Sequence, residues 1–180
     1  MPSHVRLIQF ARAGPLWGLW LFAWVFLAQL GHLIEHISVA IQDRGLLGPQ
    51  FDSELSHLLF NGAIALLSLV LALSYPRSPW VYLLLAMSII HATEHVYIYD
   101  QFLKTGVTNG PGLLGQGGAI GVFPLARLDL HNVYNGAEMI LIVLGIWNEA
   151  EILLTGSGPV AVKRSSVSGS TPRRSTAGQK

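Results

Sequence analysis

Two short motifs place histidine and glutamate inside apolar segments: residues 32–36 read HLIEH and residues 91–95 read HATEH. On a helix, positions i and i+4 lie about 40° apart around the axis. His32 and His36 should therefore project from one stripe, with Glu35 beside them, and the second motif repeats this arrangement. Neutral imidazole and carboxylate are ligands of zinc, iron, manganese and copper(II). Each motif is therefore a candidate half of a metal site.

Each motif also opens a longer pattern that occurs twice in the chain. A GLLG segment follows at 45–48 and again at 112–115, and the next apolar segment opens with HLLFNGA (57–63) or HNVYNGA (131–137). The second copy has a loop that is about fifteen residues longer. This order predicts the duplication of a two-helix unit. Two such copies keep the same orientation and should be related by a pseudo-twofold axis along the membrane normal.

All four expected helices contribute histidine at one depth, toward the same end of the bundle. A charged group in hydrocarbon costs at least about 2.5 kcal/mol, so such residues face a partner or a cavity. A divalent metal would supply that partner, and sites of this kind lie in the core between facing helices. The number of candidate ligands exceeds that of one structural zinc site, which predicts a dinuclear centre. We expect the metal ligands to be His32, Glu35, His36, His57, His91, Glu94, His95, His131 and Glu138.

Two glutamates are also candidates for catalysis. Glu138 has no counterpart in the first copy, where Ile64 stands, and a functional asymmetry would fall there. We expect Glu138 to transfer a proton or to be an extra ligand. Glu54 lies one helical turn before His57 and forms a Glu-x-x-His pair with it. Its position at the membrane edge is equally consistent with a solvated carboxylate.

The pattern leaves several chemistries open. Our preferred hypothesis is a membrane metalloenzyme with iron, copper or zinc that acts on a lipid-like or other apolar molecule, with redox chemistry favoured over hydrolysis. The His-x-x-Glu-His spacing also matches inverted zincins, so an intramembrane zinc hydrolase is an alternative. A haem-binding electron carrier is a second alternative, although haem ligation needs no neighbouring carboxylate. A third is a metal-handling or structural subunit of a membrane complex, but the inner halves of the apolar segments offer no polar path for transport.

Composition supports a membrane location. Hydrophobic residues make up 51% of the 180 residues and charged residues only 12%, about half of the charged share of a typical soluble domain. The formal net charge of +1 gives no reason to expect a nucleic-acid partner. The chain has no cysteine, which excludes disulfides and thiolate ligands. We expect membrane lipid as the environment and a lipid-like substrate as a partner, with a homo-oligomer or a larger membrane complex left open.

Four apolar stretches are close to the ~20 residues that a helix needs to cross the hydrocarbon core. They cover about 15–41, 54–74, 79–99 and 129–148. The short connection at 74–78 contains Pro76, which cannot continue a helix, so its flanking helices should be antiparallel neighbours. We therefore predict an all-α integral membrane four-helix bundle. One domain would span 1–155, with repeats at about 15–74 and 79–148.

The flanking charges predict how this bundle is oriented. Cytoplasmic flanks carry the excess of basic residues, which places both termini in the cytoplasm and the histidines toward the outer face. One side would hold Arg6, Arg12, Arg77, Lys163, Arg164, Arg173, Arg174 and Lys180, and the other Arg44, Lys104 and Arg127. The glycine-rich loop at about 100–127 is a candidate lid, so we expect substrate contact in the second half. The segment 156–180 has the composition of a disordered basic tail.

Overall fold

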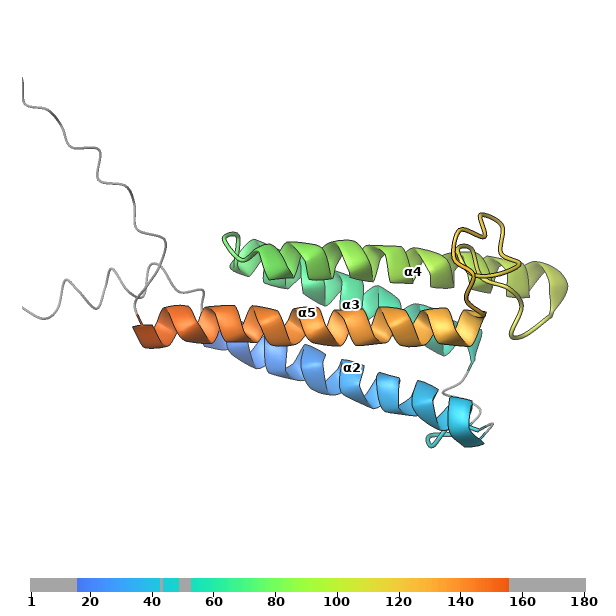
Figure 1. The fold of residues 1–180 in the computed structure, drawn as a ribbon, viewed down its shortest axis with the longest axis horizontal. Helices are drawn as coiled ribbons and strands as arrows, with labels where there is room; N and C mark the ends of the chain where they lie inside the picture. The colour runs from blue at the N-terminus through green and yellow to red at the C-terminus, as the bar shows by residue number, and fades with distance from the viewer. Residues whose placement is uncertain (1–15, 43, 49–52, 156–180) are drawn as a thin grey trace, which may run out of the picture.

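The structure is a computed structural model that describes residues 16–42, 44–48 and 53–155. In this part of the chain all regular structure is helical (Figure 1). Its four helices are α2 (Leu16–Gln42), α3 (Glu54–Ser74), α4 (Pro79–Thr105) and α5 (Arg127–Thr155). The all-α prediction is therefore confirmed. The predicted basic tail at 156–180 and the first fifteen residues lie outside the described residues.

The helices lie side by side and alternate in direction (Figure 1). The start of α2, the end of α5 and the short turn between α3 and α4 all lie at one end of the bundle, which we call the turn end. The loops after α2 and α4 lie at the opposite end, which we call the loop end. Among the helix pairs, α3 packs most extensively on α4 and α2 on α5, whereas α2 and α3 share a much smaller interface. In Figure 1, α2 diverges from the other helices toward the loop end.

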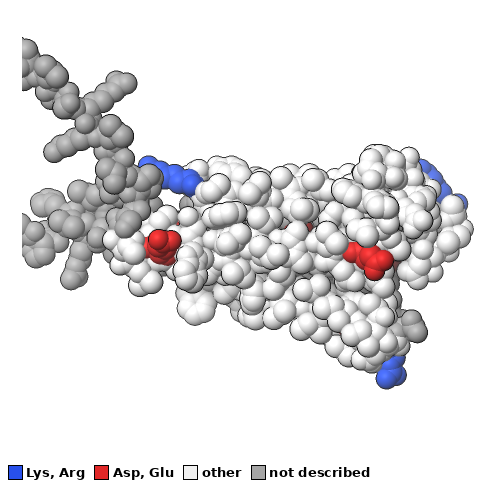
Figure 2. All heavy atoms as spheres, in the orientation of Figure 1, with Lys and Arg blue, Asp and Glu red and all other residues white. Residues whose placement is uncertain are grey.

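Three of the helices, α2, α3 and α4, are long and apolar enough to cross a membrane. The 29-residue α5 is not among them, and it carries acidic residues along its length at Asp129, Glu138, Glu149 and Glu151. Large apolar side chains are nevertheless exposed on all four helices, including Trp20, Leu66, Ile90 and Ile140. The face seen in Figure 2 carries its charged side chains mostly toward the two ends. These features indicate a membrane protein, while membrane crossing by α5 stays a prediction.

The bounds of α2 and α3 agree with the apolar stretches to within a residue, but α4 and α5 are longer. Beyond its apolar stretch, α4 continues to Thr105 with an ion pair between Asp100 and Lys104 (2.6 Å) at i,i+4 spacing. The residue that caps the end of α4 is Gly106, whose φ of 69° is the left-handed conformation that favours glycine at this position. Hydropathy detects the length of a helix that lies in hydrocarbon, so it misses polar turns beyond it.

The half of the bundle at the turn end has an apolar core that includes Phe22, Leu71, Leu84 and Ile142, each with no exposed surface. There α2 and α5 approach closely at Gly145, where a Cβ atom would meet the ring of Phe22. Small residues at helix crossings of this kind allow close backbone approach. This packed half supports the polar half of the bundle at the loop end.

Candidate metal centre

Six histidines from all four helices gather near the loop end of the bundle. They form two groups of three, in each of which one nitrogen per residue lies within 4.8 Å of the others. In each group, two histidines come from a single His-x-x-Glu-His motif and the third from the following helix. The first histidine group is His32, His36 and His57, and the second histidine group is His91, His95 and His131.

The two groups touch one another. Within the first group, the Nε2 atoms of His32 and His36 are 3.2 Å apart. Between the groups, the ring of His36 stacks on that of His131 with centroids 5.9 Å apart, and His57 stacks on His95 at 5.5 Å. The chain has seven histidines, so this single cluster contains all of them except His4, which lies outside the described residues.

Backbone carbonyl groups orient the histidine that α3 and α5 each contribute. The Nδ1 atom of His57 is 3.0 Å from the Ser53 carbonyl oxygen, and that of His131 is 2.7 Å from the Arg127 carbonyl oxygen. A carbonyl oxygen only accepts, so Nδ1 must carry the proton in both rings. Nε2 is then the unprotonated nitrogen of each ring, which is the usual arrangement in a histidine that binds a metal through Nε2.

The second histidine group is deeply buried and short of hydrogen bonds. Both ring nitrogens of His91 and His95, and Nε2 of His131, have no hydrogen-bond partner among the described residues. Each of these side chains is at most 1% exposed. Burying polar atoms without partners is costly, by about 1–3 kcal/mol for each in protein mutational data. A metal ion bound by this group would satisfy one nitrogen of each ring.

The glutamate of the first motif binds the loop that follows it. One Glu35 oxygen accepts a hydrogen bond from the backbone N–H of Leu46 (2.9 Å), and the other accepts one from the N–H of Leu47 (3.1 Å). These residues belong to the GLLG segment at 45–48. A Cβ atom on Gly45 would collide with the carboxylate, so glycine is needed for this close approach.

Glu94 makes the matching contacts in the second half. Its carboxylate accepts hydrogen bonds from the backbone N–H groups of Leu113 (2.8 Å) and Leu114 (3.1 Å), and a Cβ atom on Gly112 would collide with it. The GLLG segments thus bind the motif glutamates, which sequence reasoning did not foresee. Neither Glu35 nor Glu94 belongs to a histidine group, and their role as metal ligands stays a prediction.

Converting Glu35 or Glu94 to glutamine tests that role. Glutamine has a single acceptor oxygen, so one of the two backbone hydrogen bonds should be lost, and a hydrogen bond to a charged group contributes about 1.5–3 kcal/mol. We expect E35Q and E94Q to lower the free energy of unfolding by about this amount while the metal content per chain is unchanged. Denaturant unfolding and elemental analysis measure the two quantities, with the exposed Glu151→Gln as the control. Loss of a metal ion in either variant would identify the glutamate as a ligand.

Glu54 is buried rather than solvated, and its contacts link α3 to α5 and to the long loop between α4 and α5. Its carboxylate accepts hydrogen bonds from both terminal nitrogens of the Arg127 guanidinium (2.9 and 2.5 Å) and from the backbone N–H of Asn109 (3.1 Å). Arg127 also donates to the Gly110 carbonyl oxygen (3.3 Å). Glu54 therefore links the starts of α3 and α5 to the long loop 106–126. These contacts give it a structural role, and its role in catalysis stays untested.

Glu138 lies in the bundle core with no exposed surface. The side-chain amide of Gln29 donates hydrogen bonds to Glu138 and to Asn135 Oδ1 (2.9 Å). The other Glu138 oxygen is 3.4 Å from Nδ1 of His91, so this carboxylate adjoins the second histidine group. Sequence reasoning missed Gln29. Gln29 could have been found as a polar amide in the middle of an apolar stretch, one helical turn before His32.

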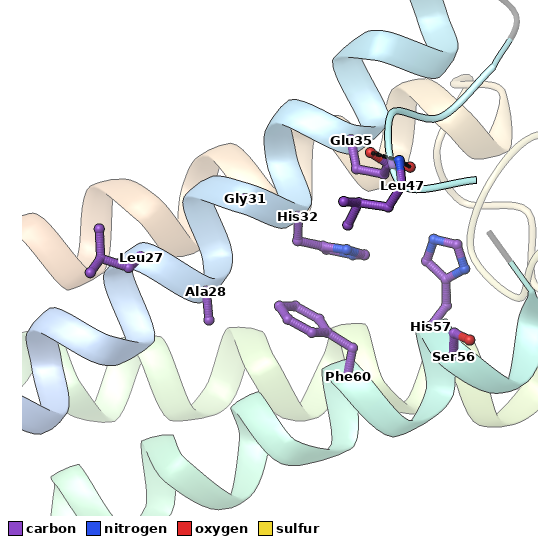
Figure 3. A pocket seen from close by; sticks show the side chains of 9 residues that line it. All are labelled: Leu27, Ala28, Gly31, His32, Glu35, Leu47, Ser56, His57 and Phe60. Atoms are coloured by element: carbon purple, nitrogen blue, oxygen red, sulfur yellow. Dashed lines mark hydrogen bonds between the residues drawn. The ribbon is translucent and has the colours of Figure 1, made fainter. Parts of the chain in front are cut away.

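Two cavities reach the histidines. The outer mouth, about 360 Å³, opens at the loop end and is in contact with both groups. Its lining is His36, Val39, His57, His95, Asn109, Arg127, Leu128 and His131. The side cavity, about 480 Å³, lies between α2 and α3 and reaches the first group alone (Figure 3). The long loop lines the outer mouth at Asn109, and its role as a lid stays a prediction. The side cavity lies in the first half of the chain.

Comparison with models of protein families, with curated proteins and with solved structures gives no match for this chain. Apolar helices and two histidine groups that could hold metal ions fit a membrane metal protein.

Proposed function

We propose that this protein is a membrane metalloenzyme with a dinuclear centre, in which each histidine group binds one metal ion. The observation that carries the proposal is the pair of three-histidine groups in contact within one bundle. Three protein ligands leave a coordination position open, which is the feature that separates catalytic from structural metal sites. Two such ions side by side could together bind and transform one small group.

The corresponding contacts of the two halves support an origin by duplication. Both glutamates of the His-x-x-Glu-His motifs bind the N–H groups of a GLLG segment, and both third histidines donate Nδ1–H to a carbonyl four residues earlier. We propose that the halves are two copies of one metal-binding hairpin, related by a pseudo-twofold axis along the membrane normal. In this arrangement all four helices cross the membrane, both termini are cytoplasmic and the centre lies toward the outer leaflet.

The donor atoms favour copper over zinc and iron. Di-iron bundle proteins surround their metals with carboxylates, whereas the carboxylates of Glu35, Glu94 and Glu54 here have other partners. Imidazole suits copper, zinc and iron, and copper(II) binds most tightly among these divalent ions. Because copper changes oxidation state, a copper pair favours redox chemistry, and we propose an oxidoreductase that acts on a lipid-like or other apolar molecule.

The geometry argues against a zinc hydrolase of the inverted zincin kind. In that chemistry, the motif glutamate must reach the metal-bound water and accept its proton. Both oxygens of Glu35 accept backbone hydrogen bonds from the loop, and the Glu94 carboxylate is bound in the same way. The Glu138 carboxylate adjoins the second group, but it lies outside the motif that defines such hydrolases.

The packing of the rings argues against haem as well. Two axial histidines must face each other across a flat macrocycle, and here neighbouring imidazoles from different helices lie only 4.6–5.9 Å apart between centroids.

A metal transporter would need a polar path toward the turn end. The core at the turn end includes the apolar side chains of Phe22, Leu71, Leu84 and Ile142, which offer no ligand to a metal ion. The buried hydroxyls of Ser68 and Ser88 lie 3.3 Å apart, so they can hydrogen-bond to each other.

Optical and electron paramagnetic resonance spectra of the purified protein test this proposal. We expect absorption bands or paramagnetic signals of a redox metal that change when dithionite is added, without a Soret band. If the purified protein contains zinc and shows neither absorption bands nor paramagnetic signals, the redox assignment is contradicted and hydrolytic or structural zinc is favoured. A Soret band would replace the dinuclear centre with haem.

A further inference from the structure

The side cavity gives the two histidine groups unequal surroundings. It is lined by Leu27, Ala28, Gly31, His32, Glu35, Leu47, Ser56, His57 and Phe60 (Figure 3). Among these, His32 and His57 belong to the first histidine group, and no residue of the second group lines the cavity. His32 is also only partly buried, whereas all three residues of the second group are buried.

The walls of the side cavity are mainly apolar. Leu27, Ala28 and Phe60 lie along its length, and the imidazole of His32 stacks on the Phe60 ring at 4.2 Å between centroids. The Glu35 carboxylate is already bound to the loop backbone. In Figure 3, the His32 and Phe60 side chains point into the space between α2 and α3. A ligand of this cavity gains burial of apolar surface and few hydrogen bonds.

The position of the cavity determines what can reach it. It lies between two helices that are each apolar and long enough to cross a membrane, and these two helices share a small interface. Its opening at the side of the bundle is lined mainly by residues of these two helices, together with Leu47 of the loop after α2. Where α2 and α3 cross a bilayer, this opening faces hydrocarbon rather than water. Its volume of about 480 Å³ is within the usual range of about 300–1,000 Å³ for ligand sites.

We propose that the side cavity admits a single hydrocarbon chain of a membrane lipid from the bilayer, and that the first histidine group holds the metal ion that meets it. This inference rests on the proposed function and names its substrate class. The second group, which adjoins Glu138 and has no contact with the cavity, holds a supporting ion. The outer mouth, with its polar lining, is then the route for small polar molecules such as water.

Gly31 offers a substitution that fills the cavity without disturbing the fold. A Cβ atom at Gly31 meets nothing within 4 Å, and glycine inside a helix is about 1 kcal/mol less favourable than alanine. Leucine at this position should therefore extend into the opening at no cost in stability. Gly136 on α5 is the matched control, because its Cβ atom would also meet nothing within 4 Å and it lines neither cavity that reaches the histidines.

The test uses the full chain in lipid nanodiscs that contain a fatty acid with a photoreactive diazirine near the chain end. After irradiation, we expect labelled peptides to include Ala28 and Phe60. We expect Gly31→Leu to reduce this labelling at least tenfold and Gly136→Leu to leave it unchanged. A bulkier Ala28→Phe should reduce labelling in the same way. Labelling that is absent in the wild type or unchanged in Gly31→Leu would overturn the proposal.

Metal content, measured on the same samples, separates this inference from the proposed function. Both glycine variants should retain the metal content of the wild type, because neither position belongs to a histidine group. Bound metal without chain labelling would contradict the lipid route alone. Chain labelling in a protein that binds no metal would contradict the metal centre and would leave a lipid-binding cavity.

Discussion

Replacing His95 with alanine is expected to remove at least one metal ion from each chain. The His95 ring lies at the centre of the cluster, within 5.5 Å of the rings of His57, His91 and His131 between centroids. Both of its nitrogens are buried without a hydrogen-bond partner in the described residues. Losing a residue that only orients a ligand lowers metal affinity about 10- to 100-fold, so losing one of three ligands should cost more than about 100-fold.

Two other variants complete this experiment. His36→Ala should remove the ion of the first histidine group in the same way, because His36 is a member of that group. His4→Ala is the control, since His4 is the single histidine of the chain that is not among the six of the two groups. Elemental analysis after dialysis against a weak chelator gives the metal content of all three. If His95→Ala and His36→Ala both keep the wild-type content, the histidine groups do not bind metal.

Replacing Glu138 with glutamine is expected to weaken metal binding at the second histidine group alone. A carboxylate close to the outer nitrogen of a ligating histidine makes the ring a better donor to the metal, here through its charge, because Nδ1 of His91 has no hydrogen-bond partner among the described residues. Glu138 is 3.4 Å from Nδ1 of His91 and is positioned by Gln29. Glutamine keeps the shape but loses the charge, so we expect a decrease of about 10- to 100-fold in affinity for one of the two ions.

A titration that resolves two binding steps measures this effect. Glu149→Gln is the matched control, because Glu149 is another buried glutamate of α5, about three turns away toward the turn end. Glu138→Ile gives the second half the residue that stands at the corresponding place in the first half, Ile64. Glu138→Ile should lower the affinity of the second histidine group for its metal ion, and the helix content should be unchanged. Equal weakening of both binding steps, or none, would contradict the assignment of Glu138 to the second group.

Much of the fold could be predicted from the sequence, because long apolar stretches between polar segments predict the helices of a membrane protein. The bounds of α2 and α3 followed from these stretches almost to the residue. The polar ends of α4 and α5 did not, since hydropathy does not detect helical turns with polar side chains, such as the one that contains the ion pair between Asp100 and Lys104. The grouping of the histidines followed from helical spacing and from the depth of each motif.

The roles of the carboxylates were harder to predict. Composition could show that Glu35 and Glu94 need partners in an apolar segment, but not that those partners are backbone N–H groups of the GLLG loops. The repeated glycines were the available signal, because only glycine allows such close approach. The ion pair of Glu54 with Arg127 joins residues far apart in sequence, and no local pattern encodes it. The same holds for the contact of Gln29 with Glu138.

The side cavity also depends on tertiary structure. It exists because α2 packs on α5 and diverges from α3 (Figure 1), which shifts the expected substrate contact from the second half of the chain to the first. Helical periodicity gives the face that each helix buries but not the angle at which two helices cross.

We propose that this bundle holds two metal ions, one in each histidine group. Elemental analysis of the purified wild-type protein, with protein concentration from amino-acid analysis, tests it most directly. We expect two equivalents of a redox metal per chain, and copper in preference to iron. A protein that binds no metal, or one equivalent under saturating conditions, would contradict it.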